Sequence, residues 1–230
     1  MSSAGSGTGE YERSSLQGTY RIISINIRAA AASFLSLSLT DRVISRSLRS
    51  CISKAGTVTP STRSSFIRYA SYTIEFLESR LDATEQSWLP LLSKYDRDLS
   101  ARAEVYRHLR QSSQRTNETL NMANTSKSEE LGENIPKVLT ELWEELEPVF
   151  DTDVVLLNKI RVKVSSEDIK KIEEEEKRRR LGMMKTNGHL WCATYLMRSL
   201  TPEEREQFPP GVPNMAKSAM LIAGNWQFSR

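Results

Sequence analysis

The chain has 230 residues and a mass of 26.1 kDa, which is enough for one domain with a sizeable core. Its hydrophobic fraction of 38% and charged fraction of 27% are typical of a soluble helical protein. No apolar run approaches the roughly 20 residues that span a bilayer, so no membrane partner is expected. A net charge of +3 does not by itself predict binding to nucleic acid.

The positive charge is concentrated near the N-terminal end. Between residues 20 and 70, Asp41 is the only acid and the bases are Arg21, Arg28, Arg42, Arg46, Arg49, Lys54, Arg63 and Arg68. No aromatic platform is interleaved with these side chains, as single-stranded nucleic-acid sites require. The charges are therefore interpreted as solvated helix faces, and no nucleic-acid partner is expected.

Cysteine usage favours a reducing compartment. Cys51 and Cys192 give neither a disulfide framework nor the spacing of a zinc site. The N-terminus lacks the charged and apolar regions of a secretory signal, so a cytoplasmic location is expected. Residues 13–49 are rich in Arg and Ser and poor in acids, which leaves mitochondrial import as an alternative.

Four long helices are predicted in a single domain that follows a flexible, Gly- and Ser-rich tail. The tail covers residues 1–18 and the domain residues 19–230. Helical spacing of apolar residues predicts helices over 24–55, 61–93, 98–126 and 135–163. The first ends near Gly56, and Pro90 predicts a kink or an early stop in the second. The inward face of the third is the least apolar.

Shorter helices are predicted after the fourth. Residues 165–181 begin with Ser165 or Ser166 as a cap and are interpreted as a solvated helix or linker. Residues 188–199 are apolar enough to dock on the other helices, and Thr201 caps a helix that starts at Pro202. A last segment follows the turn at 209–213. No strand-period segment occurs, so the fold class is all-α: a four-helix bundle with additional C-terminal helices.

Four side chains of metal-ligand type fall on the predicted inward faces, one for each long helix: Asp41, Glu85, His108 and Asp153. Asp153 is the strongest candidate because it takes a core position in the stripe Ile135, Leu139, Leu142, Leu146, Val149/Phe150, Leu157 and Ile160. Facing helices of bundles build metal sites from such groups. The same groups could transfer protons to an organic ligand, since burial moves their pKa values toward neutrality. Each also has a structural alternative, as a helix-start, boundary or surface residue.

Known catalytic motifs are missing from the sequence. It contains no nucleophile motif, phosphate loop, dinucleotide-binding glycine pattern or paired zinc ligands. Histidine occurs only twice, and His189 is interpreted as a cap or surface residue. Any chemistry is therefore expected to come from side chains that the fold brings together.

The order of segments resembles the hemerythrin-like, HHE cation-binding bundles found in fungi and other organisms. The stretch SFIRYASYTIEFLESRLDATEQSWLPLLSKYD resembles their second helix and LSLTDRVISRSLRS their first. The helix with Glu144 to Asp153 resembles the fourth, and residues 200–228 resemble the tail of fungal members. The resemblance covers residues 35–230 and implies an up-down, hemerythrin-like four-helix bundle.

Most of the metal ligands that this resemblance implies are replaced here. The histidine of the first helix would fall at Asp41, and those of the second helix at Ser79, Arg80 and Leu81. Glu85 keeps its glutamate and His108 lies near a histidine position, while Val149 replaces a histidine and Asp153 a glutamate. A cation at Arg80 would oppose metal binding, so no cofactor is expected.

These observations favour a metal-independent, hemerythrin-like bundle that binds a small organic molecule in its core. It would act as an acid/base isomerase, cyclase or dehydratase of fungal secondary metabolism. The resulting candidates are Asp41, Glu85, His108 and Asp153 for proton transfer, with Tyr72, Arg80, Trp88 and Val149 as substrate-binding residues. Two alternatives stay open: a metal-binding protein with an altered site built from the four proton-transfer candidates, and a non-catalytic interaction protein.

Overall fold

The computed structural model describes residues 38–96, 98–125, 129–172, 174–175, 178, 191–207 and 213–228. Every element in these ranges is a helix, which confirms the predicted all-α class. The predicted tail at 1–18 and the predicted start of the first helix at residue 24 lie outside the described residues. Within the described ranges, no helix is both long and apolar enough to cross a bilayer.

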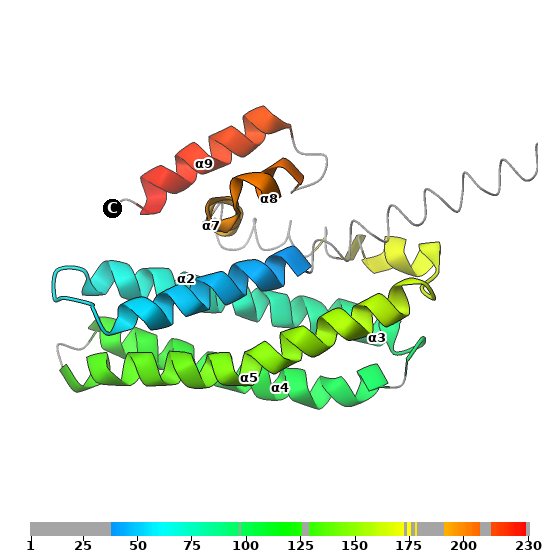
Figure 1. Ribbon diagram of the computed structural model, residues 1–230, viewed down its shortest axis with the longest axis horizontal. Coiled ribbons are helices and arrows are strands. Elements are labelled where there is room, and N and C mark those ends of the chain that lie inside the picture. Colours follow the sequence, from blue (N-terminus) through cyan, green and yellow to red (C-terminus); the bar gives the residue numbers. More distant parts are fainter. Residues whose placement is uncertain are drawn as a thin grey trace, which may run out of the picture.

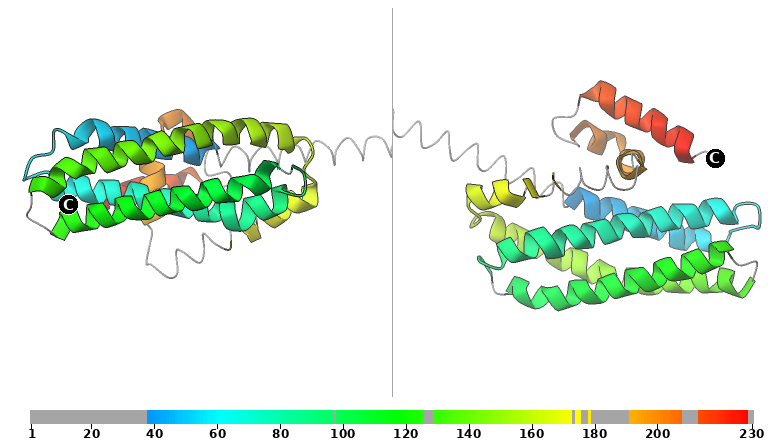
Figure 2. Two further views of the ribbon diagram at one scale, coloured as in Figure 1. Left: turned by 90° about the horizontal axis from the view of Figure 1, so that it is seen from below. Right: turned by 180° about the vertical axis from the view of Figure 1, so that it is seen from behind.

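Four long helical segments lie side by side and alternate in direction, and they are called the bundle below (Figures 1 and 2). The first is residues 38–55. The second runs from α2 (Arg63–Ala83) through the π-helical η1 (Thr84–Trp88) to α3 (Leu89–Leu92), and the third and fourth are α4 (Asp98–Thr125) and α5 (Glu129–Arg161). The predicted helix bounds agree with these to within a few residues, except that α5 starts six residues before the predicted position.

Apolar stripes from all four segments build the core. On α5, the predicted stripe from Ile135 to Ile160 is buried, with Leu157 half-buried. The helix 38–55 buries Leu39, Val43, Ile44, Leu48 and Cys51 against it. Full burial of one such aliphatic side chain contributes about 1.5–3 kcal/mol, so packing of these stripes is the main stabilising term.

Pro90 does not stop the second segment early, because the helix continues to Leu92. The backbone widens instead into η1, where the N–H of Leu89 donates to the carbonyl of Thr84, five residues earlier. Proline lacks the N–H that would bond four residues back, so the wide turn keeps the chain helical just before it. The turn buries Thr84, Ser87 and Trp88, which places polar side chains next to the core.

The inward face of α4 differs from the predicted one at its N-terminal half. His108 was predicted to face the core, but its side chain is 62% exposed, and the nearby Val105 is 38% exposed. Tyr106 and Leu109 are buried at this level of the helix. The helix is rotated because its polar residues Arg102 and Tyr106 reach a buried carboxylate on α5, which an aliphatic stripe does not reveal.

A C-terminal lobe of three helices covers the face of the bundle formed by helix 38–55 and α2 (Figure 1). It consists of α7 (Trp191–Ser199), α8 (Pro202–Gln207) and α9 (Asn214–Phe228). The predicted cap at Thr201 is confirmed: its hydroxyl accepts from the Glu204 N–H at 3.3 Å, and Glu204 accepts from the Thr201 N–H at 3.0 Å. This reciprocal pair fixes the start of α8.

The charged segment after α5 is anchored to the bundle rather than fully solvated. Residues 166–172 are helical, Ser165 caps them by accepting from the Asp168 N–H at 3.1 Å, and Ile169 is buried. The hydroxyl of Tyr95 donates to Asp168 at 2.6 Å and accepts from the Ser165 N–H at 3.0 Å. One tyrosine thus ties this segment to the loop before α4.

Candidate functional site

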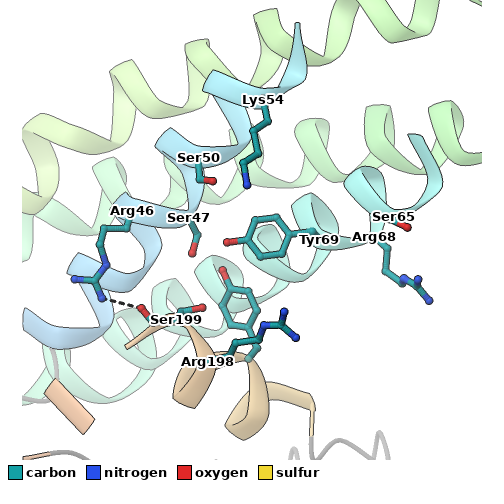
Figure 3. A pocket seen from close by; sticks show the side chains of 10 residues that line it. Arg46, Ser47, Ser50, Lys54, Ser65, Arg68, Tyr69, Arg198 and Ser199 are labelled. Carbon is teal, nitrogen blue, oxygen red and sulfur yellow. Dashed lines mark hydrogen bonds between the residues drawn. The ribbon is translucent and has the colours of Figure 1, made fainter. Parts of the chain in front are cut away.

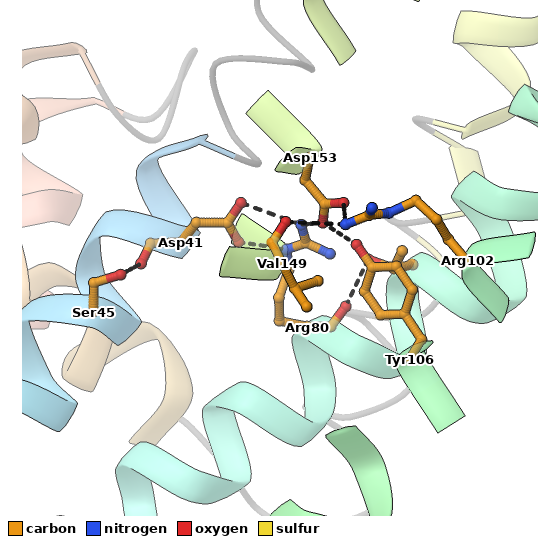
Figure 4. A network of polar contacts seen from close by, with 8 residues as sticks. Asp41, Ser45, Arg80, Arg102, Tyr106, Val149 and Asp153 are labelled. Atoms are coloured by element: carbon orange, nitrogen blue, oxygen red, sulfur yellow. Dashed lines mark hydrogen bonds and ion pairs between the residues drawn. The ribbon is translucent and has the colours of Figure 1, made fainter. Parts of the chain in front are cut away.

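A network of buried charges crosses the middle of the bundle, and its five residues are called the core network: Asp41, Arg80, Arg102, Tyr106 and Asp153 (Figure 4). Arg80 on α2 donates to both oxygens of Asp41 on helix 38–55, at 2.8 and 3.2 Å. An Nη of Arg80 also lies 3.9 Å from Asp153 on α5. The structure therefore brings together the two predicted aspartates, with a guanidinium between them.

Helix α4 completes the core network. Arg102 lies 2.7 Å from one carboxylate oxygen of Asp153 and donates to the carbonyl of Val149 at 3.1 Å. The hydroxyl of Tyr106 donates to the other carboxylate oxygen of Asp153. Each of the four bundle segments thus contributes a polar side chain. Two carboxylates face two guanidiniums, so the buried charges balance.

Burial governs the electrostatics of the core network. Asp41, Arg80 and Asp153 are each only 5% exposed. Burial raises the pKa of Asp41 above its ordinary 3.8, and the guanidinium of Arg80 opposes that shift. Burial also raises the pKa of the Tyr106 phenol well above its usual range, so this group stays a hydrogen-bond donor. An isolated charge here would be costly, and the pairing offsets that cost.

The free space beside the core network is small. A cavity of about 20 Å³ lies between Arg80, Thr84, Tyr106, Asp153 and apolar side chains. One Nη of Arg80 is buried without a hydrogen-bond partner among the described residues. A space of this size admits about one water molecule. An organic ligand does not fit, so the predicted location of the ligand in the core is not supported by this geometry.

The remaining predicted proton-transfer residues do not join the core network. Glu85 is half-buried and pairs with Arg110 on α4. The imidazole of His108 is exposed, with its Nδ1 3.4 Å from a carboxylate oxygen of Glu145 on α5. The predicted inward position of His108 is therefore wrong, because the rotation of α4 turns Tyr106 inward in its place.

The predicted substrate-binding residues are divided between the core and its edge. Trp88 is 2% exposed and lines the small cavity with Arg80. Val149 contacts the core network through its backbone carbonyl, which accepts a hydrogen bond from Arg102. Tyr72 is half-buried and packs against the hydrophobic core. The cavity that Arg80 and Trp88 line is about 20 Å³, which is too small for an organic substrate.

The donor set does not fit the metal centre that the family resemblance implied. In the described part of the chain, no three His, Cys, Asp or Glu side chains converge as metal ligands. Arg80 holds the carboxylate of Asp41 and approaches that of Asp153, so a cation already occupies the position between them. A metal ion at this position would face a fixed positive charge.

A larger pocket opens between helix 38–55, α2 and α7, and it is called the basic pocket below (Figure 3). Its volume is about 470 Å³. Four cationic side chains line it: Arg46, Lys54, Arg68 and Arg198. None of its described lining residues is acidic. Ser47, Ser50, Ser65 and Ser199 add hydroxyl groups. Concave sites of this volume are typical of small-molecule binding.

Two tyrosines form the inner wall of the basic pocket. Tyr195 from α7 is 2% exposed, and its hydroxyl shares a 2.9 Å hydrogen bond with Thr73 on α2. Its ring packs 6.1 Å from that of Tyr69 and 5.4 Å from that of Phe76, measured between ring centroids. Burial raises the pKa of Tyr69, although a hydrogen bond with Ser47 partly offsets the shift. Both phenols are therefore neutral donors at physiological pH.

One cation of the basic pocket is paired with a carboxylate of the C-terminal lobe. Arg46 donates to Glu204 on α8 at 2.7 Å and to the carbonyl of Ser199 at 2.9 Å. This pairing lowers the pKa of Glu204. Lys54 and Arg68 form no ion pair with any residue that the structure describes. The pocket therefore carries an excess of positive charge.

A second surface hollow, of about 540 Å³, lies where α4 meets α5 and includes His108. Its charged groups pair with one another: Arg107 with Glu104 at 2.6 Å, and His108 with Glu145. Glu145 also accepts from Ser112 at 2.5 Å. The hollow is more open than the basic pocket and its charges are already satisfied, so it is the weaker candidate.

Sequence reasoning missed the basic pocket although part of its signal was visible. The run of bases between residues 20 and 70 includes Arg46, Lys54 and Arg68, and it was interpreted as solvated surface. Tyr195 and Arg198 are more than 120 residues away along the chain. Only the docking of α7 shows that these groups share one concave surface.

The chain is similar to a curated fungal protein over most of its length. It is 33% identical over 201 residues to xanthocillin biosynthesis cluster protein F of Aspergillus fumigatus. The aligned part covers 86% of this chain and 89% of the relative. No protein-family model matches the chain, and no solved structure is significantly similar to it. The likeness therefore extends over most of both proteins.

Proposed function

The chain belongs to the family of xanthocillin biosynthesis cluster protein F, and we propose that it serves fungal secondary metabolism by binding a small organic molecule without a metal ion. The relative is named for a biosynthesis cluster, which supports a role in secondary metabolism. The guanidinium of Arg80 between two core carboxylates supports the metal-independent part. A hemerythrin-like origin of the bundle belongs to the same proposal.

The basic pocket is the proposed site of the ligand. The observation that carries this choice is the contrast in free volume: about 470 Å³ in the basic pocket against about 20 Å³ beside the core network. The first volume accommodates an organic molecule, whereas the second accommodates a water molecule. The ligand would therefore bind at the surface between the bundle and the C-terminal lobe, and not in the core as the sequence predicts.

An acid/base reaction, such as an isomerisation, cyclisation or dehydration, is the catalytic form of this proposal. Neutral hydroxyls and fixed cations stabilise negative charge that develops on a ligand oxygen. Tyr69 is the proposed donor because it lies at the inner wall and its raised pKa keeps it protonated. Lys54 and Arg198 would add electrostatic stabilisation from the same pocket.

The experiment is a ligand capture from a small-molecule extract of a fungus that carries a related gene cluster. Chelator-treated protein is incubated with the extract and desalted, and the retained compounds are identified by mass spectrometry. We expect a compound to be retained by the wild type and lost from Ser50→Trp, which fills the basic pocket. Ser64→Trp is the matched control, because Ser64 is exposed and does not line the pocket.

Two results would contradict the proposal. Retention of the same compound by Ser50→Trp would place the ligand elsewhere. Retention only before chelator treatment would favour the alternative of a metal-binding protein with an altered site. The first result would contradict only the location of the ligand, and the second only its independence from a metal ion.

A further inference from the structure

We infer that the ligand of the basic pocket is an organic molecule with a dianionic phosphate group. The inference rests on the proposed function, since it names the class of molecule that the same pocket takes. It follows from three features of the pocket: its uncompensated charge, its excess of hydrogen-bond donors and its aromatic wall.

The charge of the basic pocket exceeds what one carboxylate can balance. Glu204 neutralises Arg46, with 2.7 Å between the charged atoms. Lys54 and Arg68 both line the pocket and enter no ion pair within the described ranges, so at least two of its positive charges are unbalanced. A phosphate monoester carries about −1.5 to −2 charges at pH 7, whereas a carboxylate carries one. A phosphate group therefore matches the two unbalanced cations.

The hydrogen-bonding groups of the pocket are mostly donors. Lysine and arginine side chains donate and cannot accept. Tyr69 is held protonated by burial, and Ser47 and Ser50 add hydroxyls that can turn to donate. A phosphate group offers three acceptor oxygens to such a set, and charge-assisted bonds to it are among the stronger hydrogen bonds in proteins.

The arrangement of these groups leaves a place for the organic part. Figure 3 shows Ser47 and Lys54 on helix 38–55 facing Tyr69 on α2, with Arg198 reaching the pocket from α7. The rings of Tyr69 and Tyr195 form an apolar wall beside these polar ends. A small phosphorylated molecule would place its phosphate near Lys54 and its carbon skeleton against the rings.

The test is a titration of the full chain by calorimetry with three probes of one shape: phenyl phosphate, benzoate and benzyl alcohol. We expect phenyl phosphate to bind at least about ten-fold more tightly than benzoate, and benzyl alcohol to bind weakest. Affinity for phenyl phosphate should rise as pH increases through about 6, where the second phosphate proton leaves. Inorganic phosphate is titrated in parallel to separate a free anion from an organic phosphate.

Lys54→Met and Arg68→Met should each weaken phenyl phosphate binding by about ten-fold, because a charge-assisted hydrogen bond is lost. Both residues are exposed, so the fold is expected to persist. Lys137→Met is the matched control: it also removes one exposed lysine, and its carboxylate neighbour is Glu141 on α5. Its affinity should equal that of the wild type.

Different results overturn different claims. Equal affinities for benzoate and phenyl phosphate, or no effect of Lys54→Met, would overturn the phosphate inference while the proposed function stands. Equal affinities for inorganic and phenyl phosphate would overturn the claim of an organic phosphate. A compound captured from the extract that lacks phosphate and depends on Ser50 would also overturn the inference alone, whereas a failed capture would overturn the proposed function itself.

Discussion

In the core network each guanidinium faces a carboxylate, whereas in the basic pocket Lys54 and Arg68 face none among the described residues. The two regions use similar side chains, since both combine arginine with tyrosine hydroxyls. In the core the charges are balanced and the free volume is only about 20 Å³. In the basic pocket the charge is unbalanced and a volume of about 470 Å³ stays open.

This difference separates a structural role from a binding role. A buried ion network with balanced charges fixes how helices meet, and the cavity of about 20 Å³ beside it leaves no room for an organic ligand. A concave surface with unsatisfied cations binds anions because the ligand supplies the missing charge. The predictions below test whether the core network acts on stability and the basic pocket on binding.

The largest effect is expected from Arg80→Met, which removes the cation between Asp41 and Asp153. Two buried carboxylates then lose their shared partner, which should lower the free energy of unfolding by about 3–5 kcal/mol. Denaturant unfolding measures this loss. The control is Arg107→Met, whose exposed pair with Glu104 should cost less than about 1 kcal/mol. Equal losses in both variants would contradict the structural role of the core network.

Tyr195→Phe tests how the C-terminal lobe holds the wall of the basic pocket. The substitution removes the hydroxyl that pairs with Thr73, whose own hydroxyl keeps its bond to the Tyr69 carbonyl at 3.0 Å. The free energy of unfolding should fall by about 1–2 kcal/mol. A double-mutant cycle with Thr73→Val isolates the pair, and a coupling near zero would show that this hydrogen bond does not join α7 to α2.

Acidification should change the contributions of the two regions to the free energy of unfolding in opposite directions. The pKa of Glu204 is lowered by its hydrogen bond to Arg46, so its contribution to stability is complete above its ordinary 4.5 and is lost as pH falls through the lowered value. Burial raises the pKa of Asp41, so its contribution is present below 3.8 and is lost as pH rises through the raised value.

The measurement is the free energy of unfolding from about pH 6 to about pH 3 for the wild type, Glu204→Gln and Asp41→Asn. On acidification, the stability of the wild type should fall relative to Glu204→Gln and rise relative to Asp41→Asn. The difference in stability between wild type and variant could instead change with pH in the same direction for Glu204→Gln and Asp41→Asn. That result would mean that the two carboxyl groups do not differ in environment.

The smallest effect is expected from His108→Ala. The imidazole is 62% exposed, and Glu145 has Ser112 as a second partner. Stability should change by no more than about 0.5 kcal/mol, and the affinity for phenyl phosphate should be unchanged. A large loss of ligand binding or turnover would restore His108 as a proton-transfer residue and count against the basic pocket.

The sequence was sufficient to predict the fold class and the buried positions of Asp41 and Asp153. Asp153 interrupts a regular apolar stripe, so its inward position follows from helical periodicity. The face of α4 could not be predicted, because Tyr106 and Arg102 point inward only to reach a carboxylate on another helix. The basic pocket could not be predicted either, because it depends on where α7 docks.

The most direct test of the account is amide chemical-shift mapping by NMR during a titration with phenyl phosphate. The account predicts shifts concentrated in residues 46–54, 65–69 and 195–199, the segments that contain the residues lining the basic pocket. Amides next to Arg102 and Asp153 in the core network should not shift. Shifts confined to the core network, with the pocket residues unchanged, would contradict the assignment of the ligand to the basic pocket.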